Sequence, residues 1–256
     1  MRSMYRVWAA IWLTSVVAIV PCAAYADQTT AGISIIVVHG QHVEQNGIAN
    51  APLVPAPVLE LSRRSRSLEV SAEGIPPLRS YAVGSNALGI RSIGLSYFQS
   101  SIRYWNKAGT FAAGVGETLY NQRTDYVIYS SSQLVTGQYD ASRVVGARYE
   151  IVGRKPLGTQ SGVELSLSVN PSLHGRMGWT DYQTFAGRLA TLQLPPEWER
   201  GSQVQLVAQV DRRAGAFGLR YGIRYLNYIA RFDDGTLADR NTFIMPFFGV
   251  TRAFGP

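Results

Sequence analysis

Apolar and polar side chains alternate along two adjacent segments, 203–211 and 217–225, which a short turn joins. In the first segment the apolar face is aliphatic, and Val207 is the one apolar residue on the polar face. In the second segment the apolar face is largely aromatic and consists of Phe217, Leu219, Tyr221, Ile223 and Tyr225. Glycine and arginine occupy its opposite face. A period of two residues predicts β-strands. Large residues on one face and small or charged residues on the other favour a barrel with lipid outside.

The same alternation recurs earlier in the chain. Segments 67–73, 92–97, 111–119, 145–151 and 162–170 each carry an apolar set that is expected to face lipid. In segment 92–97 this set is Ile93, Leu95 and Tyr97. Three further segments are less regular: a continuous apolar run at Ile33–Val38, a weaker strand at Val58–Arg63, and a final strand at about Thr242–Phe254. The pattern therefore predicts up to ten strands.

The lengths of the connections decide between strand counts. Short turns are expected near 64–65, 106–108, 156–158 and 213–214, and longer connections over 40–56, 74–88, 123–141, 171–201 and 233–239. Outer-membrane barrels have short periplasmic turns and longer outer loops. Ten strands, beginning with Ile33–Val38, place all the short turns on the periplasmic side. The alternative is eight strands, with the N-terminal segment as a plug or tail.

The first 26 residues have the features of a cleaved secretory signal peptide. Arg2 and Arg6 precede an apolar stretch at 7–20, and Ala24-Tyr25-Ala26 forms a small-x-small cleavage site. We therefore predict a signal peptide at 1–26 and a single β-barrel domain at 27–256. Cys22 is the only cysteine, so the mature chain has no disulfide or thiolate metal site. No later segment approaches 18 apolar residues. This leaves a membrane barrel or, as the alternative, a soluble exported barrel with an inner ligand cavity, similar to a lipocalin.

Arginine supplies almost all of the positive charge. The full chain carries +7, and loss of Arg2 and Arg6 leaves 7 − 2 = +5. The arginines are spread along the strands rather than gathered in one basic stripe, which argues against nucleic-acid binding. Charges that point into a small barrel must pair. We therefore predict an arginine–glutamate network that fills the lumen, in which Arg220 and Arg224 pair with Glu150 and Glu164. Its predicted members are Glu69, Glu73, Arg148, Glu150, Glu164, Arg220 and Arg224. A narrow, porin-like solute path is the alternative.

Overall, the mature chain resembles the small outer-membrane β-barrel proteins of Gram-negative bacteria. The resemblance rests on the alternating strands and on an aromatic residue near the end, Phe254, of the kind that the assembly machinery reads in such barrels. It implies a cell-envelope protein located in the bacterial outer membrane, in contact with outer-membrane lipids and with the assembly machinery. We expect a monomer without a cofactor.

Two groups of residues are candidates for chemistry in the outer connections. His174 has Ser172 before it and Asp181 after it, which could supply a base, a nucleophile and an orienting group. His39, His42 and Glu44 could bind a metal, but on a strand His39 and His42 would face opposite ways. Neither group forms a recognisable motif. The sequence thus favours a structural or ligand-binding barrel that acts through its outer loops, with a lipid- or peptide-modifying enzyme as the alternative.

Overall fold

The computed structural model describes residues 28–44, 47–76, 81–82, 90–130, 134–185 and 188–254. The predicted signal peptide lies outside these residues. In the described part of the chain, no helix is long and apolar enough to cross a membrane. The strands are β1 (Gln28–Glu44), β2 (Gly47–Ser65), β3 (Leu68–Ile75), β4 (Tyr81–Ala82), β5 (Ile90–Trp105), β6 (Phe111–Ser130), β7 (Leu134–Pro156), β8 (Ser161–Phe185), β9 (Arg188–Gln193), β10 (Glu197–Ala214), β11 (Phe217–Phe232) and β12 (Leu237–Phe254).

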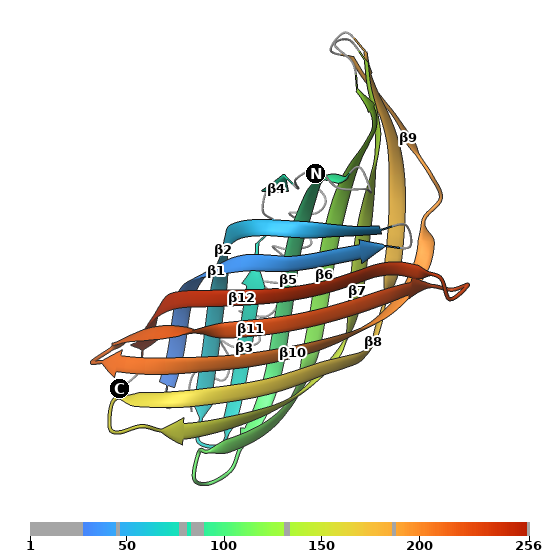
Figure 1. Ribbon diagram of the computed structural model, residues 1–256. Helices are drawn as coiled ribbons and strands as arrows, with labels where there is room; N and C mark the ends of the chain where they lie inside the picture. The colour runs from blue at the N-terminus through green and yellow to red at the C-terminus, as the bar shows by residue number, and fades with distance from the viewer. Residues whose placement is uncertain are drawn as a thin grey trace.

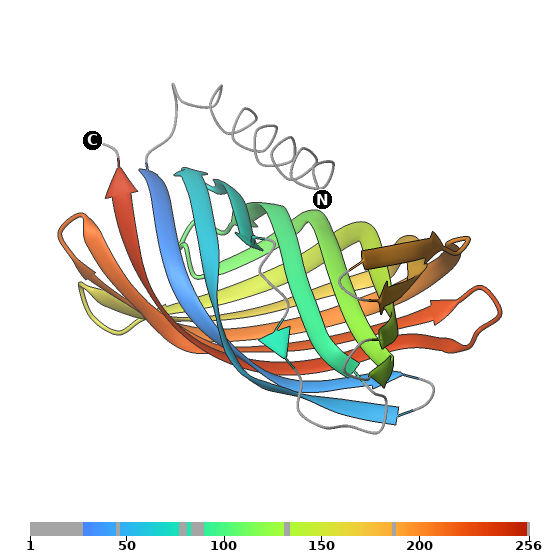
Figure 2. The ribbon, with the colours of Figure 1, turned by 90° about the horizontal axis from the view of Figure 1, so that it is seen from above.

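Ten of these strands close into an antiparallel barrel, which confirms the predicted count. Each barrel strand pairs with its neighbour along the chain, except that β3 pairs with β5 and β8 with β10. The ring closes where β1 pairs with β12, with Thr29 opposite Phe254. Figure 2 shows these two strands side by side, β1 in blue and β12 in red. The short strands β4 and β9 add to β5 and β8. The hairpin that showed the alternation most clearly, β10–β11, forms barrel strands eight and nine as predicted.

Short turns connect the strands at one end of the barrel. They lie at 66–67, 106–110, 157–160 and 215–216. Gly109, Gly158 and Gly215 adopt positive φ angles of 68°, 131° and 65° in these turns, a conformation that glycine tolerates without a steric penalty. By the usual arrangement of outer-membrane barrels this end is periplasmic.

Most of the predicted outer loops are strand, so those predicted loop bounds were wrong. β6 continues to Ser130 and β8 continues to Phe185. β1 ends only at Glu44, and β2 already begins at Gly47. Figure 1 shows β6, β7, β8 and β9 projecting beyond the rest of the barrel. We call this projection the outer extension, residues 123–130, 134–141, 178–185 and 188–193. Beyond the lipid both faces of a sheet can meet water, so the apolar–polar alternation that revealed the other strands disappears there.

A belt of large apolar side chains covers the outside of the barrel. Tyr221 and Ile223 are 49% and 47% exposed and point away from the lumen. A lipocalin-like barrel would require these residues inside, so that alternative is wrong. Other strands contribute to the belt in the same way, through Ile33, Ile35, Ile102, Val115, Val145, Tyr149, Ile151, Leu165, Val204, Leu206, Phe217, Leu219, Ile244, Phe248 and Val250.

The middle of the lumen is packed with apolar side chains. We call this group the apolar layer; it includes Tyr97, Tyr120, Leu226, Phe243 and Met245, each at most 2% exposed. The assignment of Ile93, Leu95 and Tyr97 to lipid was therefore wrong, because all three side chains are buried and Leu95 and Tyr97 belong to this layer. Val207, the exception in the opening pattern, faces the same layer.

Candidate functional site in the barrel lumen

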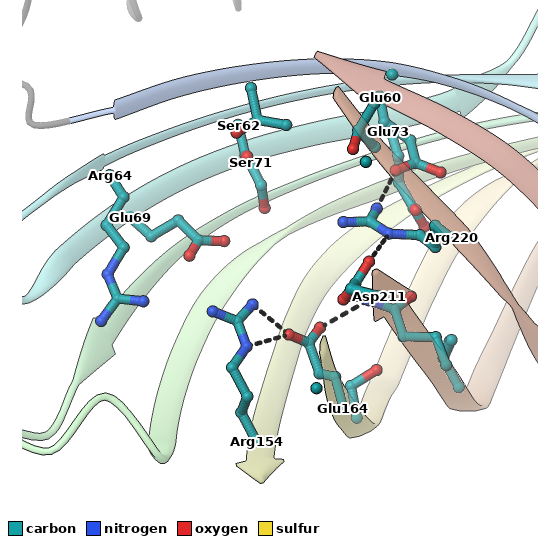
Figure 3. Close-up of a pocket in the computed structure, with 18 of the residues that line it drawn as sticks. Glu60, Ser62, Arg64, Glu69, Ser71, Glu73, Arg154, Glu164, Asp211 and Arg220 are labelled. Carbon is teal, nitrogen blue, oxygen red and sulfur yellow. Dashed lines mark hydrogen bonds and ion pairs between the residues drawn. The ribbon is translucent and has the colours of Figure 1, made fainter. Parts of the chain in front are cut away.

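A charged cavity of about 420 Å³ occupies the lumen between the apolar layer and the short turns. Its walls come from β1, β2, β3, β5, β7, β8, β10, β11 and β12, and the turn at 157–160 contributes to its rim. Figure 3 shows Glu60, Glu73, Arg154, Glu164, Asp211 and Arg220 directed into it. The alternation of each strand explains this arrangement, because every second residue of a barrel strand points inward.

Arg103 connects two of the carboxylates. Its Nη1 donates to Oε1 of Glu69 at 2.8 Å, and its Nε donates to Oε1 of Glu150 at 2.6 Å. Glu150 also pairs with Arg148 at 3.1 Å, and its side chain is 0% exposed. Trp105 Nε1 donates to the second oxygen of Glu69 at 2.9 Å. Two arginines thus balance two glutamates in a set that is largely removed from water.

Arg220 and Arg224 each pair with a glutamate on a strand that is distant in sequence, and Arg220 also pairs with Asp211 on the neighbouring strand of its hairpin. Arg220 donates from Nε to Asp211 at 2.8 Å and from Nη1 to Glu60. Arg224 Nη2 donates to Glu73 at 2.8 Å, while its Nη1 donates to the hydroxyl of Tyr97 in the apolar layer. Figure 3 shows the Arg220 guanidinium between Glu60 and Asp211. Arg224 therefore links the ion pairs that line the charged cavity to the apolar layer.

Two further arginines lie over Trp105 near the short turns. Arg64 and Arg154 place their guanidinium carbons 4.6 and 4.8 Å from the ring centroid. Arg154 also donates from Nε to Glu164 at 3.0 Å. Cation–π contacts of this kind hold a charge over an aromatic face, so Trp105, which is 0% exposed, anchors the periplasmic side of the cavity.

The structure places all seven predicted lumen residues inside the barrel, each with an ion-pair partner. The predicted pairing was wrong, because Arg220 and Arg224 pair with Glu60, Asp211 and Glu73 rather than with Glu150 and Glu164. Sequence reasoning missed Arg103, Arg154, Glu60 and Asp211. The alternation could have identified Arg103, because it lies between Ile102 and Tyr104, whose side chains point outward.

A second polar cluster lies in the lumen on the other side of the apolar layer. His42 Nδ1 lies 2.7 Å from Asn241 Oδ1, and His42 Nε2 lies 3.6 Å from Asp239. Gln122 Nε2 donates to Asp239 at 3.2 Å, and Asn241 Nδ2 donates to Gln122 Oε1 at 2.8 Å. Beside it, the rings of Tyr120 and Tyr228 stack with centroids 4.6 Å apart. His42, Asp239 and Asn241 are all 0% exposed, so this cluster fills its space.

The candidate metal ligands do not converge. His39 is exposed while His42 is fully buried, so the two imidazoles lie on opposite sides of β1. The side chain of Glu44 lies outside the described residues. Among the described residues, no group of three or more histidine, cysteine or carboxylate side chains could hold a metal ion.

The candidate catalytic residues form one contact but no triad. Ser172 Oγ lies 2.7 Å from His174 Nε2. Both residues are exposed and lie in strand β8. The prediction that they lie in a loop was wrong. Asp181 instead accepts a hydrogen bond from Gln138 at 2.8 Å. Seven residues separate Asp181 from His174 along the strand, which corresponds to roughly 24 Å. Asp181 therefore does not orient His174.

Comparison with known proteins agrees with this fold. No family model and no curated protein matches the chain. The solved structure of the outer membrane protease OmpT from Escherichia coli is similar with a TM-score of 0.51 and 10% identity, over 89% of this chain and 97% of that chain. Neisserial surface protein A matches with a TM-score of 0.32 and 10% identity, over 89% and 97%. The Pseudomonas putida toluene transporter TodX matches with a TM-score of 0.36 and 9% identity, over 90% of each chain. The fold is that of the bacterial outer-membrane β-barrels, and the apolar belt places the chain in that membrane.

Proposed function

We propose that this chain is a closed, non-conducting outer-membrane barrel that recognises its ligand through the outer extension. The observation that carries the proposal is the apolar layer. Ions cross a barrel through water, and large side chains such as Tyr97, Phe243 and Met245, each 1% exposed, pack together in the lumen at this level. On one side of this layer ion pairs line the charged cavity, and on the other side the His42 cluster lies in the lumen. This arrangement favours a closed barrel over a narrow solute path.

The outer extension supports the second half of the proposal. It carries large apolar side chains outside the lipid belt: Ile128, Phe185, Leu189 and Leu192 are 70%, 58%, 66% and 62% exposed. Exposed apolar groups beyond the membrane are typical of interaction surfaces. Among the described residues, β9 pairs with β8 alone, so its second edge offers free backbone groups to an extended ligand.

Conductance in planar bilayers tests the closed lumen. Wild-type protein, folded into lipid bilayers, should show no stepwise conductance. A Tyr97→Ala/Phe243→Ala variant, which removes two rings from the apolar layer, should conduct and serves as the control for correct insertion. Regular steps from the wild-type barrel, with an amplitude similar to the variant, would contradict the proposal.

The outer extension should tolerate substitution without loss of stability. A Leu189→Ser/Leu192→Ser variant should unfold within about 0.5 kcal/mol of wild type per site, since both side chains are exposed and contribute little packing. Heat-dependent gel mobility and urea unfolding measure this. A large loss of stability would show that these leucines pack within the fold and are not free to bind a ligand.

A further inference from the structure

Four arginines and a histidine form a continuous basic patch on the outside of the barrel. The patch extends over β7, β8, β10 and β11, and all of its side chains are exposed. We call it the outer basic patch; its members are Arg143, His174, Arg176, Arg200 and Arg231. The register aligns them in two rows. Arg143 lies opposite Arg176 in the first, and Arg200 lies between His174 and Arg231 in the second.

The outer basic patch places like charges directly opposite each other. Residues at opposing positions of an antiparallel pair have Cβ atoms about 5 Å apart, and like charges there destabilise the sheet. Arg143–Arg176 and Arg200–Arg231 are two such pairs. Among the described residues, the only carboxylate within ion-pair distance of the patch is Asp233, 3.4 Å from Arg200, and both side chains are more than half exposed. The repulsion is therefore largely uncompensated within the chain.

The patch directly adjoins the apolar belt. Val145 lies two residues from Arg143, and Val204 lies four residues from Arg200, which corresponds to about 7 and 14 Å along the strands. The Arg176 guanidinium lies 4.0 Å from the ring centroid of Trp198, which is 53% exposed. Tryptophan is enriched at membrane–water boundaries. The patch thus lies at headgroup depth, on the side opposite the short periplasmic turns.

We propose that the outer basic patch binds the phosphate groups of a phosphorylated glycolipid of the outer leaflet. Guanidinium groups match the geometry of phosphate oxygens and bind them through paired hydrogen bonds. One phosphate between Arg143 and Arg176 and a second near Arg200 and Arg231 would replace the repulsion in both rows by attraction. The apolar belt just below would contact the acyl chains of the same lipid. The site needs no opening of the lumen, so its test is independent of the conductance test.

Lipid binding to the purified barrel in a non-ionic detergent tests the proposal. The probes are bis-phosphorylated lipid A, the same lipid with both phosphates removed, and inorganic phosphate. Bis-phosphorylated lipid A should raise the unfolding temperature of the wild-type barrel, and the other two probes should not. An Arg143→Gln/Arg200→Gln variant interrupts both arginine pairs but keeps the Arg176–Trp198 contact. It should bind the phosphorylated lipid at least about tenfold more weakly, as expected for lost charge-assisted hydrogen bonds.

A matched control removes the same charge from the other end of the barrel. Lys107 and Arg252 are exposed near the short turns, so Lys107→Gln/Arg252→Gln should respond to lipid as wild type does. Without lipid, the Arg143→Gln/Arg200→Gln barrel should be at least as stable as the control, because its substitutions relieve repulsion. Equal lipid binding by the two double variants, or equal stabilisation by the dephosphorylated lipid, would overturn the proposal. Equal stabilisation by inorganic phosphate would show a site for free anions instead.

Discussion

Replacing Arg103 with methionine should lower the free energy of unfolding by about 3–5 kcal/mol, the usual cost of breaking a buried ion pair. Arg103 bonds both Glu69 and Glu150, and its side chain is 17% exposed while that of Glu150 is 0% exposed. Without the guanidinium, Glu69 keeps only the indole N–H of Trp105 among the contacts described above, and Glu150 keeps Arg148. A surplus negative charge would remain in the lumen.

Urea unfolding in detergent or lipid vesicles, followed by tryptophan fluorescence, measures this loss. A second substitution separates charge from packing. The Arg103→Met/Glu69→Gln variant leaves Arg148 and Glu150 as a balanced pair and should regain most of the lost stability. Arg200→Met removes an arginine whose pair with Asp233 is largely exposed and which faces Arg231, so it should change the free energy of unfolding by about 1 kcal/mol or less. If Arg103→Met costs no more than Arg200→Met, the lumen charges are hydrated and the buried network is not what stabilises this end of the barrel.

The architecture could be predicted from local sequence because successive side chains of a strand alternate between its two faces, so odd and even positions (the parity of a residue) can be separated. Alternation identified the strands, and the position of the short turns favoured ten of them over eight. Parity states which residues share a face, but it does not state which face is inside. Ile93, Leu95 and Tyr97 were assigned to lipid because the lumen was expected to be polar throughout. The lumen instead has an apolar layer at their level, and it buries Tyr97 to 1% exposure.

The partners of the lumen charges could not be predicted in the same way. Arg220 and Glu60 are 160 residues apart, and Arg224 and Glu73 are 151 residues apart. Such contacts cross the lumen, so they depend on the tilt and stagger of strands that are not neighbours. Alternation along one strand contains no information about stagger. It therefore placed Arg220 and Arg224 inside but could not choose among the available carboxylates.

A local irregularity explains the position of Ser172 and His174. Asn170 and Leu173 are 1% and 0% exposed, so both side chains point inward. Even-numbered residues of β8 therefore face the lumen up to Asn170, and odd-numbered residues face it from Leu173. The register with β7 and β10 shifts at the same place. An extra residue in one strand is a β-bulge, and Pro171 suits it because proline cannot donate to the ladder. The bulge turns His174 outward and brings it into the row of Arg200 and Arg231.

Phe243→Ala should also cost about 3–5 kcal/mol, the range for removing a buried aromatic ring. Phe243 is 1% exposed in the apolar layer, whereas Phe248 on the same strand is 54% exposed and faces lipid. Phe248→Ala should cost about 1–2 kcal/mol, because it loses transfer free energy but lipid chains fill the space that the ring leaves. The lumen has no comparable mobile filler, so Phe243→Ala leaves a cavity. Urea unfolding of both variants measures the difference. Equal costs would mean that the lumen around Phe243 can refill as freely as the lipid face, which a closed and packed barrel does not allow.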